Sequence, residues 1–314
     1  MVTVGTYRSA FGGRESGKTG FGESCRRCGA RVRRPNGLSS VELLVAISVI
    51  ALLIAVLIPA LLRVRTRARM VVCQSRLKQW GLLLKLYTDD HDGRFFDGWL
   101  GPKGLTVQNY WEWIHPLWPY YEESLELLLC PMAAGMSENW VDHDAFAAWV
   151  QPSRWWNTQD NTESRQGYIA GSYGLNSWVY SVTKETTYSN RYWKSAQTLT
   201  RGAGIPVLLD SAWLQAWPFY YDEPPRYPGD FSFGMGSSKW RDAKWGTEIK
   251  GFCIDRHNGF VNGLFMDSSV REIGLKELWT LKWHKEFNRA GPWTKAGGAR
   301  AELWPMWMRQ LRDY

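Results

Sequence analysis

The sequence predicts an α+β fold in which a long N-terminal helix packs on a C-terminal antiparallel β-sheet with long, aromatic-rich loops. Three observations predict it. Residues 43–62 form a twenty-residue apolar run without a charge, apolar residues then recur at three- and four-residue steps, and short β-prone runs separated by Gly, Asn and Asp follow. With 314 residues, 45% of them hydrophobic, the chain can bury the core of one or two domains.

The apolar run from Leu43 to Leu62 predicts a membrane-spanning helix. Only Ser48 and Pro59 interrupt it, and twenty residues make a helix about 30 Å long, which matches the hydrocarbon thickness of a bilayer. A secretory signal peptide has a shorter apolar region and a small-residue cleavage site, whereas "RVRTRARM" follows this run. A buried helix of a soluble protein would not be apolar all round over this length. Arginines flank both ends, so charge alone does not orient the helix.

Glu42 is a single acidic residue directly before the apolar run. A carboxylate in hydrocarbon costs on the order of 2 to 3 kcal/mol at the bilayer centre and less near its edge, so it needs a cationic partner. A cut after Gly37 would give Leu38 a new α-amino group, four residues before Glu42. That amine, on the same or a neighbouring subunit, is a plausible partner.

The stretch "G-LSSVELLVAISVIALLIAVLIPA" resembles the type IV prepilin and type II secretion pseudopilin signature. The resemblance implies that a prepilin peptidase cleaves after Gly37, methylates the new terminus at Leu38 and leaves Glu42 as the fifth mature residue. It also implies a pilin-like fold and a helix kink at Pro59. The family usually carries Phe where this chain has Leu38.

This resemblance divides the chain into a cleaved cytoplasmic leader (1–37), a long helix (38–90) and an extracytoplasmic globular domain (91–314). The leader is rich in Gly, Arg and Ser without hydrophobic periodicity up to residue 31, which predicts disorder. It holds +6 of the net charge of +8, leaving only +2 on the remainder. A nearly neutral body argues against a nucleic-acid partner.

The helix is expected to continue beyond the membrane and to stop near "DDHDG". Val71, Leu77, Trp80, Leu84 and Tyr87 recur at helical spacing with charged residues between them, which predicts one face packed on the body.

The body is expected to form its sheet from runs at 167–180, 205–209, 252–255 and 261–266. The 20 Trp allow two interpretations. Buried indoles would fill a core or an interface, which we favour. Exposed indoles would stack on sugar rings, and the alternative function is therefore a membrane-anchored carbohydrate-binding surface protein.

The stretch "RHNGFVNGLFMDSSVREI" resembles the C-terminal motif of the prepilin-type H-X9-DG proteins, related to the DUF1559 group, with Ser268 in place of the group's Gly. Other stretches that resemble this group are "RARMVVCQSRLKQWGLLLKLYTDDHDGRF", "LLLCP", "GSYGLN" and "ELWTLKWHKEFN". We expect separate structural roles for His257 and Asp267. Asp267 should accept N–H groups of its own turn, His257 should contact a neighbour such as Asp210 or Asn262, and Ser268 should occupy a type I turn without positive φ.

The sequence gives no support for catalysis, because no nucleophile elbow, P-loop, HExxH or dinucleotide fingerprint is present. We therefore expect no enzyme and no cofactor. Two metal alternatives stay open: Ca²⁺ held near Asp210 and Asp267, and a metal-dependent enzyme built on these two residues and His257. After cleavage Cys73, Cys130 and Cys253 remain, so at most one disulfide can form, and the sequence does not choose the pair.

Taken together, these features predict a structural subunit of a type IV pilus or of a type II secretion-like filament. Its expected partners are a prepilin peptidase, other pilin or pseudopilin subunits and the membrane. The expected location is the cytoplasmic membrane, crossed once, with the C-terminal domain on its outer side. The sequence assigns no role to residues 289–314.

Overall fold

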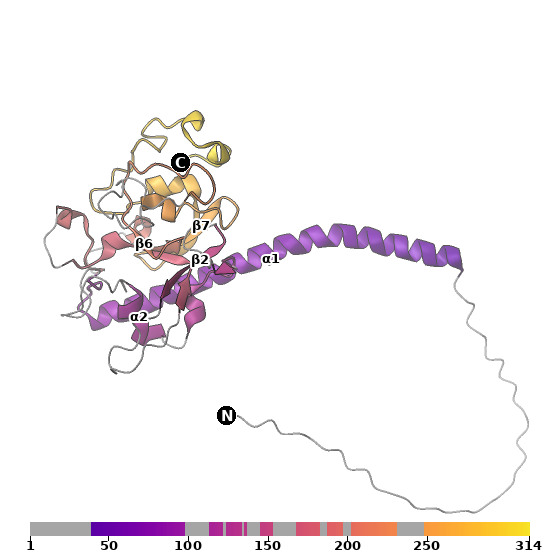
Figure 1. The fold of residues 1–314 in the computed structure, drawn as a ribbon, viewed down its shortest axis with the longest axis horizontal. Coiled ribbons are helices and arrows are strands. Elements are labelled where there is room, and N and C mark those ends of the chain that lie inside the picture. Colours follow the sequence, from indigo (N-terminus) through magenta and orange to yellow (C-terminus); the bar gives the residue numbers. More distant parts are fainter. Residues whose placement is uncertain are drawn as a thin grey trace, which may run out of the picture. The chain divides into compact units, whose positions relative to one another are not determined.

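The computed structural model describes residues 39–97, 113–121, 124–133, 135–136, 145–152, 168–182, 187–196, 202–230 and 248–314. The described chain contains one long helix and two small sheets (Figure 1). The helices are α1 (Ser40–Asp90) and α2 (Ile114–Tyr121). The strands are β1 (Gly135–Met136), β2 (Ala147–Pro152), β3 (Tyr168–Gly171), β4 (Tyr173–Asn176), β5 (Pro206–Asp210), β6 (Gln215–Ala216), β7 (Phe260–Phe265) and β8 (Val270–Gly274). Short 3-10 helices connect them, among them η1 (Leu125–Leu128), η6 (Glu248–Gly251) and η7 (Leu275–Thr280).

α1 confirms the prediction of one long N-terminal helix that stops in the "DDHDG" stretch. It ends at Asp90, after which Asp92 and Gly93 adopt positive φ angles of 54° and 75°. The Gly93 N–H donates to the Thr88 carbonyl at 2.7 Å, which satisfies one of the last carbonyls of the helix. The chain divides into two units, Met1–Ala55 and Val56–Tyr314, and the boundary between them falls within α1.

The second half of α1 presents one buried face. Its members are Met70, Cys73, Leu77, Trp80, Gly81, Leu84, Tyr87 and Thr88. The expectation for Val71 is wrong, because 55% of its surface is exposed. The steps of four and three residues that join Leu77, Trp80, Leu84 and Tyr87 extend backwards to Cys73 and Met70, not to Val71.

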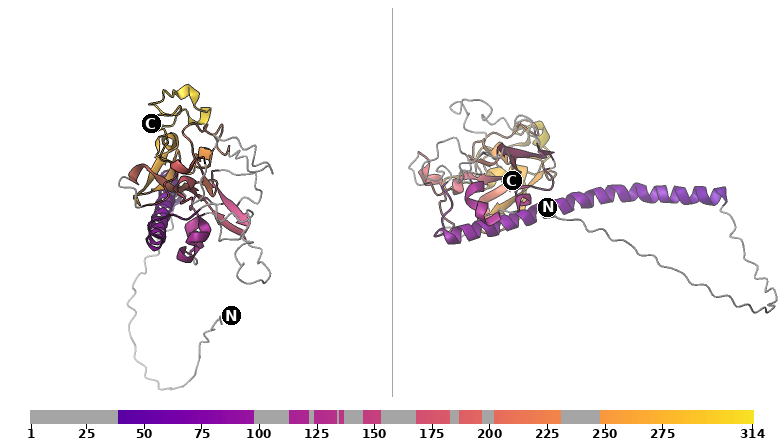
Figure 2. Two further views of the ribbon diagram at one scale, coloured as in Figure 1. Left: turned by 90° about the vertical axis from the view of Figure 1, so that its left-hand side faces the viewer. Right: turned by 60° about the horizontal axis from the view of Figure 1, so that its bottom comes forward.

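This face lies against β7 and the turn that follows it (Figures 1 and 2). The Gln74 amide donates to Asn262 Oδ1 at 3.0 Å, and the Lys78 ammonium donates to the Ser268 carbonyl at 2.7 Å. Gly81 allows the close approach, since a Cβ at this position would lie 3.0 Å from Leu264 Cδ1. The predicted packing of helix on sheet is therefore present within the second unit.

The larger sheet has the strand order β6-β4-β5-β7-β8, and the smaller one has the order β1-β2-β3. The longer strands pair antiparallel as predicted, but the two-residue strands β1 and β6 pair in parallel with β2 and β4, so both sheets are mixed. β5 is central and all five of its residues are buried. This burial on both faces explains its continuous apolar run "VLL".

One predicted strand, 252–255, is wrong. Phe252, Cys253 and Ile254 are fully buried but follow η6 as a turn. The Cys253 N–H donates to Ile249 and Lys250 carbonyls at 3.1 and 3.2 Å, so the segment uses local hydrogen bonds instead of a ladder. A short apolar run looks the same in sequence whether it is a strand or a buried turn.

The C-terminal residues 289–314, to which the sequence assigns no role, cover η7. Trp304 packs edge-to-face on Trp279 with ring centroids 5.2 Å apart, and the Lys276 ammonium lies 2.6 Å from Asp313 Oδ1. Figure 2 shows this segment, in yellow, folded back on the body. Trp304 and Met308 of this segment are therefore part of the core.

Candidate functional site

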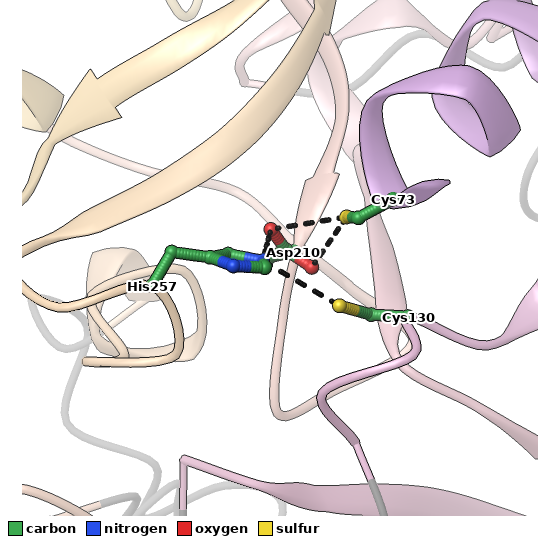
Figure 3. Close-up of side chains that lie close together, drawn as sticks. All are labelled: Cys73, Cys130, Asp210 and His257. Atoms are coloured by element: carbon green, nitrogen blue, oxygen red, sulfur yellow. Dashed lines mark hydrogen bonds and ion pairs between the residues drawn. The ribbon is translucent and has the colours of Figure 1, made fainter. Parts of the chain in front are cut away.

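Four side chains with metal-ligating or nucleophilic atoms meet in the body. Cys73 comes from α1, Cys130 follows η1, Asp210 ends β5, and His257 precedes β7 (Figure 3). Their ligand atoms all lie within 4.8 Å of one another. All four residues are buried, with exposed fractions between 0% and 5%. We call this group the Cys–Asp–His cluster.

The fold places Asp210 at the centre of the cluster. It is the last residue of the central strand, paired with Tyr173 of β4. Its Oδ2 accepts the Asn262 N–H at 2.8 Å and lies 3.1 Å from His257 Nε2, and its Oδ1 lies 3.4 Å from Arg256 Nη1. Burial alone would raise the pKa of the Asp210 carboxyl, but the hydrogen bond and charge of His257 and the charge of Arg256 hold that pKa below its ordinary value.

His257 contacts the cluster through one ring nitrogen only. Its Nε2 lies 3.1 Å from Asp210 and 3.5 Å from Cys130 Sγ. Its Nδ1 is buried and has no hydrogen-bond partner among the described residues. Burial lowers the pKa of the imidazole, yet Asp210 and Cys130 together raise it to about 10.

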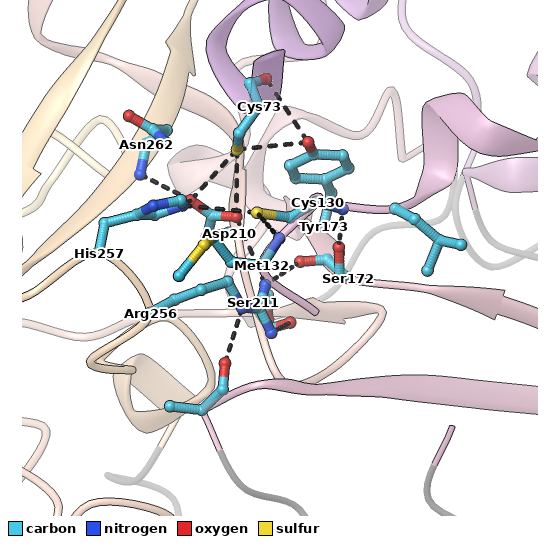
Figure 4. Close-up of polar contacts among 12 residues, drawn as sticks. Cys73, Cys130, Met132, Ser172, Tyr173, Asp210, Ser211, Arg256, His257 and Asn262 are labelled. Atoms are coloured by element: carbon cyan, nitrogen blue, oxygen red, sulfur yellow. Dashed lines mark hydrogen bonds and ion pairs between the residues drawn. The ribbon is translucent and has the colours of Figure 1, made fainter. Parts of the chain in front are cut away.

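The two thiols have different environments. Burial, with Cys130 and Asp210 adding to it, raises the pKa of Cys73 well above its ordinary value. Burial also opposes ionisation of Cys130, but hydrogen bonds from Cys73 and His257 and the charge of Arg256 lower its pKa to about 7. The Tyr173 hydroxyl donates to Cys73 Sγ at 3.3 Å, and the Met132 N–H donates to Cys130 Sγ at 3.4 Å (Figure 4). Both sulfur atoms therefore already receive hydrogen bonds of the kind that stabilise a thiolate.

Arg256 holds the surroundings of the cluster together. Its side chain is fully buried. Besides Asp210, its guanidinium donates to the carbonyls of Ala145 (2.7 Å), Ser172 (2.7 Å), Ala147 (3.1 Å) and Ser211 (3.3 Å). The guanidinium of Arg256 therefore connects the end of β5 with the segment 145–147 and with Ser172, both of which precede β5 in the chain.

The structure brings some predicted residues together and separates others. The expected contact of His257 with Asp210 is confirmed, and Asp267 accepts the Ser269 N–H at 3.0 Å within its own turn, as expected. The grouping of His257 and Asp210 with Asp267 does not form, because Asp267 lies at the β7–β8 turn and is bonded there. Thiol and imidazole are poor ligands for Ca²⁺, so the surroundings of Asp210 do not favour that ion.

The expectation for Ser268 is wrong, because its φ is 63°. The Ser268 N–H donates to the Phe265 carbonyl and the Phe265 N–H donates to the Ser269 carbonyl, both at 2.9 Å. This is a three-residue hairpin loop, in which a type I turn is followed by a residue in the left-handed region. The third loop position requires positive φ whatever residue occupies it, which is why Gly is favoured there.

The geometry differs from that of a nucleophile activated by an oriented base. In such a triad the histidine uses one nitrogen for the nucleophile and the other for the carboxylate. Here Cys130 and Asp210 share Nε2, and Cys130 is only 1% exposed. Two thiols, a carboxylate and an imidazole are instead a set of ligands that can hold a transition metal.

The predicted processing site lies at the edge of the described chain. Gly37 and Leu38 are outside the described residues. Glu42 lies in the first turn of α1, where its Oε2 accepts the Ser39 N–H at 2.8 Å, while Ser39 Oγ accepts the Val41 N–H at 3.2 Å. These contacts cap the start of the helix.

The predicted membrane span lies within α1. Residues 43–62 are all exposed, and Pro59 lies inside the helix. Among the described residues, α1 is the one helix long and apolar enough to cross a membrane, and none of its most apolar stretch is buried. The part of the chain that the structure describes therefore has one candidate membrane-spanning helix, near its N-terminal end.

The tryptophans of the described chain favour the core interpretation. Eight are buried: Trp80, Trp113, Trp149, Trp178, Trp193, Trp279, Trp283 and Trp304. The other five described ones are partly buried against the core: Trp118, Trp213, Trp217, Trp293 and Trp307. Within the described ranges no indole is exposed as a sugar-stacking platform would require. The remaining seven lie outside those ranges.

A scan of protein-family models and searches of curated proteins and of solved structures found no match to this chain. The resemblance to prepilins and to the H-X9-DG group therefore stays a prediction.

Proposed function

We propose that this chain is a membrane-anchored, prepilin-like subunit that is processed after Gly37 and assembles into a type IV pilus or a type II secretion-like filament. The observation that carries the proposal is that the two halves of α1 differ in burial. Residues 43–62 are apolar and exposed, whereas the same helix buries a face from Met70 to Thr88 in the globular body. An exposed apolar stretch of this size needs a membrane or other subunits to cover it.

Glu42 supports assembly in addition to anchoring. Its carboxylate already turns back toward the start of the helix and accepts the amide of Ser39, the residue next to Leu38. A charged amine created on Leu38 by cleavage would be a stronger partner than an amide, because both groups are ionised. Such an ion pair, made between neighbouring subunits, offsets the cost of placing the carboxylate in an apolar filament core.

The first test concerns processing. In cells that contain a prepilin peptidase, Gly37→Leu is expected to lower cleavage at least about tenfold, the scale for a misfit side chain in a specificity pocket. Intact-mass analysis would show the leader still attached. The control is Gly20→Leu, upstream in the leader, which should be cleaved normally. A mature N-terminus at Leu38 in the Gly37→Leu protein would contradict the proposal.

The second test concerns assembly. Glu42→Ala and the uncharged isostere Glu42→Gln should be cleaved and inserted like the wild type but should be lost from sheared or pelleted filament fractions, because the ion pair is missing. Ser48→Ala, a change within the same apolar run, is the control and should assemble. Recovery of both Glu42 variants at the wild-type level would refute the role of the carboxylate.

A further inference from the structure

We propose that Cys73, Cys130, Asp210 and His257 bind one Zn²⁺ ion that cross-links the body of the protein. The proposal does not depend on filament assembly. It starts from the distances between the ligand atoms. Cys73 Sγ lies 3.5 Å from Asp210 Oδ1, Cys130 Sγ lies 3.5 Å from His257 Nε2, and that nitrogen lies 3.1 Å from Asp210 Oδ2.

The two distances that involve sulfur match the edges of a zinc tetrahedron. The His257–Asp210 distance of 3.1 Å is shorter and the four ligand atoms lie within 4.8 Å of one another, so small side-chain shifts would accompany binding. Zinc–sulfur bonds of about 2.3 Å and zinc–nitrogen or zinc–oxygen bonds of about 2.0 to 2.2 Å give ligand–ligand edges of roughly 3.3 to 3.8 Å. The four side chains approach a common centre from four segments of the chain, as Figure 3 shows. A tetrahedral set of two sulfurs, one nitrogen and one oxygen suits Zn²⁺.

The charges of the site also balance when zinc is bound. Two thiolates and one carboxylate carry three negative charges, which one Zn²⁺ and the buried guanidinium of Arg256 neutralise. Arg256 Nη1 lies 3.4 Å from Asp210 and is held by backbone carbonyls on its other side. Binding leaves His257 as a neutral ligand and releases the protons of the thiols.

Groups around the ligands fix their orientation, as outer-shell partners do in metal sites. The Tyr173 hydroxyl and the Met132 N–H donate to the two sulfur atoms, and the Asn262 N–H donates to Asp210. The Gln74 amide in turn holds the Asn262 side chain. These contacts come from α1, the segment after η1, β4 and β7, so β4 and β7, which carry no ligand, also support the site (Figure 4).

The role of the ion is structural. A catalytic zinc keeps an open position for water or substrate, whereas four protein ligands close the coordination sphere. All four ligands here are at most 5% exposed. The ion would connect α1, the segment after η1, the end of β5 and the loop before β7, and it would thereby hold the anchoring helix to the sheet.

The test uses the full chain, purified in detergent without chelator under reducing conditions. Metal analysis should find about one zinc per chain, as a closed four-ligand site requires. Zinc should be lost in Asp210→Asn and in the Cys73→Ser/Cys130→Ser double variant. The matched control is Cys253→Ser, because Cys253 is equally buried but lies outside the cluster; it should keep its zinc.

Two further measurements need no variant. The wild type stripped by a strong chelator should unfold at a temperature lower by about 10 °C or more, and Zn²⁺ but not Ca²⁺ should restore the original value. Co²⁺ added to the stripped protein should give the visible absorption of a tetrahedral thiolate site. A folded, reduced wild type that binds neither Zn²⁺ nor Co²⁺ would overturn the proposal. So would zinc retained by the double variant, or a Cys73–Cys130 disulfide in protein purified without reductant, seen by peptide mapping as a mass loss of two hydrogens.

Discussion

Arg256→Met is expected to destabilise the body by about 3 to 5 kcal/mol, the usual cost of removing one partner of a buried ion pair. Methionine fills much of the volume of the arginine stem but donates no hydrogen bond. The carboxylate of Asp210 would keep its contacts with His257 and Asn262 but would lose its permanent cation. The four carbonyls that Arg256 holds would also lose their donor.

Chemical denaturation of the detergent-solubilised protein measures this loss. The matched control is Lys85→Met, which removes an equally charged residue from an exposed pair with Asp89. An exposed pair of this type stabilises by only about 0.3 to 0.5 kcal/mol. A loss below about 1 kcal/mol for Arg256→Met would mean that the buried contacts of Arg256 are replaced by water, as at the surface.

The sequence predicts the helix well because its signals are local. The apolar run, the 3.6-residue periodicity and the Asp/Gly stop each depend on neighbouring residues, and α1 ends where they indicate. β7 falls on the predicted run 261–266, but its antiparallel partner β8 is not predicted, because no strand is expected at residues 270–274.

The Cys–Asp–His cluster could not be predicted as a unit, because its members come from four segments far apart in the chain. The sequence singles out His257 through a resemblance and names Asp210 as one of two expected neighbours, whereas Cys73 and Cys130 are only two of three thiols that could form a disulfide. One local signal was available. The buried periodicity of α1 includes Cys73 once it is extended backwards from Leu77, and this places that thiol on the face toward the sheet.

Trp80→Ala is expected to cost about 3 to 5 kcal/mol, because it empties the largest buried volume on the packed face of α1. Trp80 is fully buried, and its ring lies edge-on to Trp113 and Tyr121 with centroids 5.1 and 5.0 Å away. Its indole N–H donates to the Leu127 carbonyl at 2.6 Å, and this carbonyl would lose its partner. The loss therefore combines a cavity with an unsatisfied acceptor.

The control for Trp80→Ala is Leu82→Ala, two residues further along the same helix, where 60% of the side chain is exposed. It should change the free energy of unfolding by no more than about 0.5 kcal/mol. Hydrogen exchange would show where the protein is destabilised. In Trp80→Ala, the backbone amides of residues 70 to 90 should exchange faster than in the wild type. The reason is that the second half of α1 gains stability from its packing on the body and not from its own helix propensity. Equal protection of these amides in both variants would show that the helix is held to the sheet by other contacts, such as those of Gln74 and Lys78.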